Sequence, residues 1–183
     1  MGRHDDGTDG PRTEENALED SVWATVREKH LSGLTKVQKI LQIVRQNLEV
    51  VASNAECAGR ILGAVSRIRT GDLSGRNWNS YSSVATELVG MVLDSTIWDD
   101  EAFLVEPVEK AWLPFRYARL TPSERTVRRL YQVTLRVAPR MFDERLASIL
   151  RSLGQAGELS IPGDLLRELI NLLMSRKWHL FPD

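Results

Sequence analysis

Residues 34–69 read LTKVQKILQIVRQNLEVVASNAECAGRILGAVSRIR. Apolar residues recur through this segment at alternating steps of three and four, which is a heptad pattern. The apolar positions are Leu34, Val37, Leu41, Val44, Leu48, Val51, Ala55, Ala58, Leu62 and Val65. The pattern predicts one long helix over residues 35–69, roughly 50 Å in length at 1.5 Å per residue. Its apolar seam must be covered either by the rest of the same domain or by another chain.

The rest of the chain also predicts helices. Residues 17–30 form an apolar pattern of helical period, residues 70–80 are rich in Gly, Asn and Ser and predict a loop, and a helix is expected to follow as far as residue 93. Thr121, followed by Pro122 and Glu124, predicts a helix start with Thr121 as its N-cap. A last helix is expected over residues 162–178.

No alternating pattern of useful strand length is present. We therefore predict an all-α fold, in which the long heptad helix packs with a bundle of four to six shorter helices. Residues 1–16 are rich in acids and predict a flexible acidic arm. Residues 17–183 predict a single helical domain made of the long helix 35–69, the loop 70–80 and a helical bundle over 81–183.

Charge is distributed unevenly, although the formal net charge is only −1. Residues 87–110 hold seven acids and one lysine, whereas residues 116–151 hold nine arginines and three acids. These neighbouring blocks either face each other or leave a basic surface for an acidic protein, an anionic lipid or RNA. On the helix expected after Thr121, the arginines recur at near-helical intervals opposite an apolar face. The candidate partner-binding residues are Arg125, Arg128, Arg129, Leu130, Tyr131, Arg136 and Arg140.

Residues that could support catalysis do not cluster in the sequence. His4, His30 and His179 lie far apart and have no metal-ligand spacing, and Cys57 is the single cysteine. Asp99 and Asp100 are adjacent and so point in different directions on a helix. We therefore predict that the chain is not an enzyme and has no catalytic residue, no metal and no cofactor. No apolar run approaches the ~18 residues of a membrane span, so no transmembrane segment is expected.

Residues 127–139, VRRLYQVTLRVAP, resemble the opening helix of LYR-motif mitochondrial proteins, especially the LYR-type accessory subunit of respiratory complex I. Leu130 and Tyr131 match the first two letters of the motif, and Arg136 and Pro139 match later positions, while Gln132 stands where the family has its arginine. The resemblance implies that the basic helix docks an acidic acyl carrier protein.

Residues 81–101, YSSVATELVGMVLDSTIWDDE, are similar to the small helical matrix-side subunit of the cytochrome bc1 complex. The residues that carry this similarity are Gly90, Asp94, Thr96, Ile97, Asp100 and Glu101. Both resemblances imply an accessory subunit of a mitochondrial respiratory complex, on the matrix side of the inner membrane. Its partners would be the other protein subunits of that complex.

Two other functions are consistent with the same features. A helical pair with a basic face suits a nucleic-acid-associated small subunit of a ribonucleoprotein, such as an RNA-guided effector or a viral factor. A heptad seam shared between chains suits a stand-alone coiled-coil adaptor, which would be cytoplasmic rather than mitochondrial. The leading hypothesis remains a non-enzymatic scaffold subunit of a larger assembly.

Overall fold

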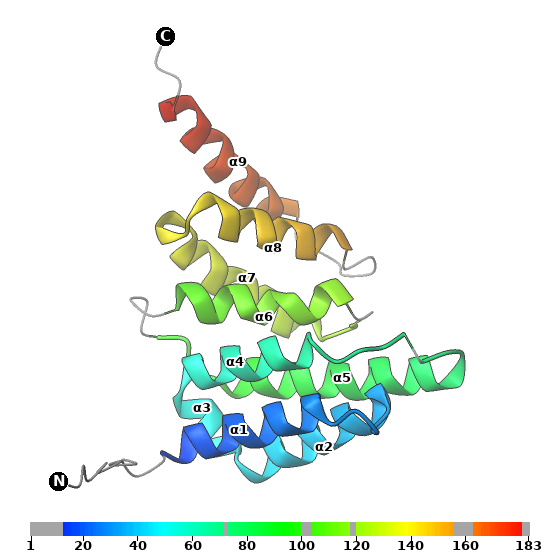
Figure 1. The fold of residues 1–183 in the computed structure, drawn as a ribbon. Helices are drawn as coiled ribbons and strands as arrows, with labels where there is room; N and C mark the ends of the chain where they lie inside the picture. The colour runs from blue at the N-terminus through cyan, green and yellow to red at the C-terminus, as the bar shows by residue number, and fades with distance from the viewer. Residues whose placement is uncertain (1–12, 72, 100–103, 118–119, 156–162, 181–183) are drawn as a thin grey trace, which may run out of the picture.

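The computed structural model describes residues 13–71, 73–99, 104–117, 120–155 and 163–180, and these contain helices and no strand. The elements are α1 (Glu14–Arg27), α2 (Gly33–Gln46), α3 (Leu48–Ser53), α4 (Ala55–Val65), α5 (Arg76–Ser95), α6 (Val105–Tyr117), α7 (Glu124–Val137), the 3₁₀ turn η1 (Ala138–Arg140), α8 (Asp143–Gln155) and α9 (Gly163–Leu180). The all-α prediction is confirmed for these residues. Figure 1 shows the helices stacked from α1 and α2 at one end to α9 at the other.

The single long helix predicted over residues 35–69 is wrong, because the chain is divided at two asparagines. Asn47 ends α2, and its Nδ2 donates to the Ile43 carbonyl at 2.8 Å. Asn54 has extended backbone (φ −135°, ψ 99°), and its Oδ1 accepts a hydrogen bond from the Cys57 amide at 2.9 Å. Asparagine side chains compete with helical backbone bonds in this way, which favours caps over helix interiors.

The heptad seam is nevertheless covered within this chain. Seven of its ten positions are buried, and Leu34, Leu48 and Ala55 are half-buried. Because α2 packs against α5 and α4 packs against α6, each part of the seam meets a different helix. The apolar pattern therefore identified the core correctly, although it did not identify the breaks.

Several predicted boundaries also differ from the structure. The N-cap before α7 is Ser123 rather than Thr121, because the Ser123 hydroxyl accepts the Thr126 amide at 3.1 Å. Helix α5 starts at Arg76, inside the predicted loop 70–80. Helix α1 starts at Glu14, so the end of the predicted acidic arm 1–16 is helical, and residues 1–12 lie outside the described residues.

Helices α4 and α6 approach each other closely. A Cβ at Gly59 would lie 2.6 Å from the Cα of Pro107 and 3.2 Å from its carbonyl oxygen. One turn further along α4, a Cβ at Gly63 would lie 3.5 Å from the Cδ of Lys110, which is an ordinary contact. The two glycines thus present a flat backbone surface to α6, and only at Gly59 is there no room for a methyl group.

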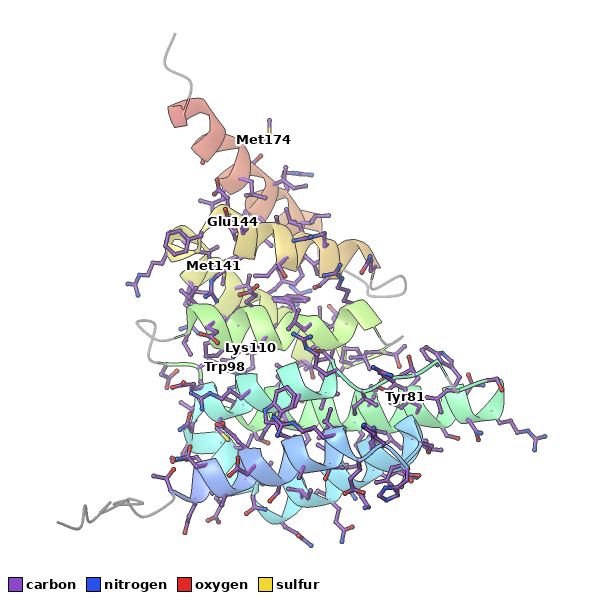
Figure 2. The ribbon with its side chains drawn as sticks, in the orientation of Figure 1. Tyr81, Trp98, Lys110, Met141, Glu144 and Met174 are labelled. Atoms are coloured by element: carbon purple, nitrogen blue, oxygen red, sulfur yellow. The ribbon has the colours of Figure 1, made fainter. Side chains whose placement is uncertain are left out.

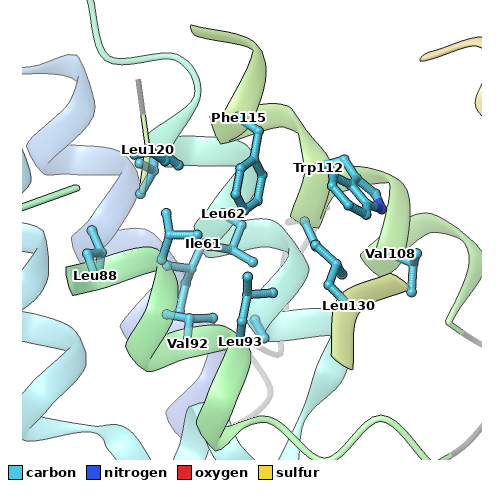
Figure 3. Packing of buried hydrophobic residues seen from close by; sticks show 14 of the residues in the cluster. Ile61, Leu62, Leu88, Val92, Leu93, Val108, Trp112, Phe115, Leu120 and Leu130 are labelled. Carbon is cyan, nitrogen blue, oxygen red and sulfur yellow. The ribbon is translucent and has the colours of Figure 1, made fainter. Parts of the chain in front are cut away.

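Helix α6 joins the two ends of the molecule through its aromatic residues. Trp112 is fully buried, and its ring lies edge-on to Tyr131 of α7 with centroids 5.3 Å apart. Its Nε1 donates to Thr134 Oγ1 at 2.9 Å, which satisfies the one polar atom of the indole. Figure 3 shows Trp112 and Phe115 of α6 among the buried residues of α4, α5 and α7.

We predict that Gly59→Ala destabilises the protein and that Gly63→Ala does not. The new methyl group at residue 59 must displace the backbone of α6, and such overpacking typically costs about 1–3 kcal/mol. The matched change at residue 63 should be neutral or raise the free energy of unfolding by up to about 1 kcal/mol, because alanine favours helix. Urea unfolding of both variants measures the difference, and equal stabilities would show that α4 and α6 are not in close contact.

Candidate interaction surfaces

Helix α7 has one apolar face and one arginine-rich face, as its sequence predicts. The apolar face is buried and includes Val127, Leu130, Tyr131, Val133 and Val137. Leu130 and Tyr131 were candidate partner-binding residues, but in this structure they belong to the core. Their side chains are therefore not accessible to a partner, because the apolar side of α7 is what attaches it to the fold.

Two arginines of α7 bind the end of α5 and the segment that follows it. Arg129 donates to the carbonyl of Asp94 at 2.6 Å and to that of Thr96 at 2.9 Å. Arg136 donates to the carbonyl of Trp98 at 3.1 Å. Cations are favoured at a helix C-terminus, where carbonyl groups lack helical partners. These two arginines therefore have a structural role and are less available for docking than the sequence suggested.

The acidic and basic blocks face each other in part. Arg145 of α8 contacts Glu109 of α6 at 2.8 Å, and both side chains are half-buried. The Thr126 hydroxyl donates to the Asp94 carboxylate at 3.0 Å. Other arginines of the basic block are exposed at the surface. Arg125 and Arg128 remain exposed on the first turns of α7, where Arg128 pairs with Glu124 at 2.8 Å, and Arg140 is exposed in η1.

Tyr131 has a buried hydroxyl group with no hydrogen-bond partner in the described part of the chain. Burial, together with the negative charge of Asp164, raises the pKa of Tyr131 to about 12. The group is therefore neutral at physiological pH, and its proton is not available for acid–base chemistry. A buried hydroxyl group without a hydrogen-bond partner lowers the free energy of unfolding.

Two of the four large exposed apolar side chains in the described part of the chain lie on α9, and Ile97, which follows α5, is another and is 55% exposed. Phe142, just before α8, is 75% exposed, Met174 of α9 is 51% exposed and Ile170 of α9 is 44% exposed. Leu169 on the other side of α9 is buried, so one side of this helix is attached and another is not. The sequence analysis did not identify this surface, because helical periodicity does not distinguish an apolar face in the core from one that is left exposed.

The described residues include no obvious catalytic or metal site. They hold no group of three or more His, Cys, Asp or Glu side chains that could bind a metal ion. Burial, with Glu19 and Glu15 nearby, raises the pKa of the Cys57 thiol to about 12, so it remains protonated and is a poor nucleophile. His30 is exposed beside Glu28, Asp99 is exposed, and His4, Asp100 and the side chain of His179 lie outside the described residues. The absence of enzymatic activity and of a cofactor remains a prediction.

Comparison with protein-family models, with curated proteins and with solved structures found no match to this chain. The two resemblances to respiratory-complex subunits therefore rest only on the short sequences quoted above. Among the described helices, none is both long enough and apolar enough to cross a membrane.

We predict that Tyr131→Phe leaves the protein as stable as the wild type, or makes it more stable by about 1 kcal/mol. The substitution removes the unpaired hydroxyl and keeps the ring that packs on Trp112. Thermal unfolding of the isolated chain measures the effect. A loss of stability would contradict the prediction and would indicate that the hydroxyl is hydrogen-bonded in solution.

Proposed function

We propose that this chain is a non-enzymatic helical subunit that binds an acidic protein partner within a larger assembly. The observation that carries the proposal is the exposure of Ile170 and Met174, which stand four residues apart on α9. Phe142, just before α8, is also exposed. Monomeric proteins rarely leave large apolar side chains grouped at the surface, and such groups mark interfaces.

The shape of the molecule supports docking at α9. This helix packs mainly against α7, α8 and η1, and Figure 1 shows its C-terminal half extending beyond the rest of the fold. Figure 2 shows Met174 on this outer part of α9. An amphipathic helix presented in this way can lie in an apolar groove of a partner, with residues at steps of three and four as contacts. Ile170 and Met174 have this spacing.

Charge favours a different, acidic protein over a second copy of this chain. The elements next to α9 belong to the block 116–151, whose arginines exceed its acids by six. A symmetric dimer through this face would bring two such basic surfaces together, which is unfavourable. An acidic partner would instead meet Arg125 and Arg140, which are both exposed. The two sequence resemblances suggest a mitochondrial respiratory complex as the assembly.

The experiment compares two double variants on the same helix. Ile170→Asp/Met174→Asp places charges on the apolar face, and the control Asn171→Asp/Ser175→Asp adds the same charges at exposed polar positions. Tagged chains are purified from the source organism, and the partner recovered with the wild type is then purified and titrated against each variant. The apolar-face variant should lose about 10–100-fold in affinity, because contact residues of this kind contribute about 1–3 kcal/mol. The control should bind within a few-fold of the wild type.

Native mass spectrometry of the isolated chain provides the second part of the test, and a monomer is expected. A dimer that the apolar-face variant dissociates would show that α9 is a homodimer interface, and the proposal would be wrong. Equal binding by the two double variants would likewise exclude α9 as the docking surface. An acidic partner should also bind more weakly at higher salt, and binding that does not depend on salt would contradict the charge argument.

A further inference from the structure

A basic hollow lies where the end of α1, the start of α2 and the end of α4 meet, far from α9 in Figure 1. Its volume is about 860 Å³. Among the described residues that line it, none is acidic and five are cationic: Arg27, Lys29, Lys36, Arg67 and Arg69. This cluster could not be recognised in the sequence, because its members come from three separate segments. Arg67 and Arg69 were also expected to lie within the long helix 35–69.

Contacts to backbone carbonyl oxygens hold the walls of the hollow together. Gly33, the first residue of α2, lies so close to the segment after α4 that a Cβ there would be 2.7 Å from the carbonyl oxygen of Arg69. Lys36 is only 9% exposed, and its ammonium group donates to the carbonyl of Val26 near the end of α1 at 2.9 Å. The hollow is therefore a fixed part of the fold, and the start of α2 adds the positive end of its dipole to it.

Four of the cations have no acidic partner within the described part of the chain. The guanidinium carbon of Arg27 lies 5.7 Å from the centroid of the Trp23 ring. The side chains of Lys29, Arg67 and Arg69 are exposed. Glu28, which stands between Arg27 and Lys29 in the sequence, is instead paired with Lys39 at 3.3 Å and with His30 at 3.4 Å. Asp72, three residues after Arg69, lies outside the described residues. Grouping like charges without counter-charges is unfavourable, and a bound anion would remove this cost.

We propose that this hollow binds a compact ligand that bears two or more phosphate groups. Guanidinium groups bind phosphate oxygens in pairs, and three arginines line the hollow. A single phosphate would neutralise fewer than half of the five positive charges. Several phosphates on one small ligand match both the charge and the volume. This site is separate from the docking surface on α9, so each proposal can fail without the other.

The surroundings favour a small ligand over a long nucleic acid. The whole chain carries a formal charge of −1, so the residues other than these five cations carry −6. Taken as a whole, the rest of the chain therefore offers an extended polyanion no net attraction. The described residues that line the hollow include no aromatic side chain on which a base could stack.

The test is calorimetric titration of the full chain with inorganic tripolyphosphate. Saturable binding at one site is expected. Arg67→Glu/Arg69→Glu should weaken it by at least about tenfold, since attraction is replaced by repulsion. The control Arg76→Glu/Arg151→Glu makes the same charge change at two exposed arginines that do not line the hollow, and should bind within about twofold of the wild type. No binding by the wild type, or equal binding by both variants, would overturn the proposal.

Two further arms distinguish the chemistry of the ligand. Citrate should bind much more weakly than tripolyphosphate, and equal affinity would show a general anion site rather than a phosphate site. Single-stranded RNA of about 16 nucleotides, the upper site size of one small binding fold, should not bind more tightly than tripolyphosphate. Tighter RNA binding that Arg67→Glu/Arg69→Glu abolishes would replace the proposal with a nucleic-acid surface. Acylation of Lys29 in the wild-type chain, mapped by mass spectrometry, should be slowed by tripolyphosphate, and an unchanged rate would contradict the proposal without any variant.

Discussion

The close contact of α4 with α6 is the constraint on which the arrangement of the other helices depends. Gly59 allows the backbone of α6 to approach at Pro107, and one turn later the stem of Lys110 covers Gly63. This position of α6 brings Trp112 against Tyr131 and within 2.9 Å of Thr134, which places α7. Helix α8 packs on α6 as well, and α9 then packs on α7 and α8. An additional methyl group at residue 59 would therefore displace helices toward both ends of the molecule, because a close-packed interior has no space for it locally.

How much of this fold could be predicted from the sequence depends on the range of the interactions involved. The heptad pattern identified seven buried positions out of ten, because periodicity reports which side chains face the core, whatever the helix length. The division at Asn47 and Asn54 depends on local hydrogen bonds of a single side chain, which periodicity does not register. The same reasoning explains the start of α7, where Thr121 and Ser123 are both good N-caps and only the backbone geometry selects Ser123.

The candidate surfaces were harder to predict, because the exposure and the binding partners of their residues depend on neighbours that are distant in sequence. Arg129 and Arg136 were expected on a docking face. They bind backbone carbonyls instead, because the C-terminus of α5 and the segment after it lie within their reach. Tyr131 was expected on the apolar face of this helix and was a candidate for partner binding, and the placement of α6 buries it. The exposed face of α9 and the basic hollow were not predicted, because exposure and the meeting of three segments are properties of the assembled fold.

The two proposed binding surfaces also differ in how firmly the fold supports them. The basic hollow is built from segments in direct contact, with a buried lysine and a glycine that tolerates no side chain, so its cations are positioned before any ligand arrives. Such preorganisation lowers the entropic cost of binding a small anion. Among the residues of α9 whose burial is described, only Leu169 is buried, so a partner would complete the packing of this helix rather than meet a finished surface. The free energy gained there would come mainly from burying apolar side chains, with the arginines of α7 and η1 contributing to orientation and association rate.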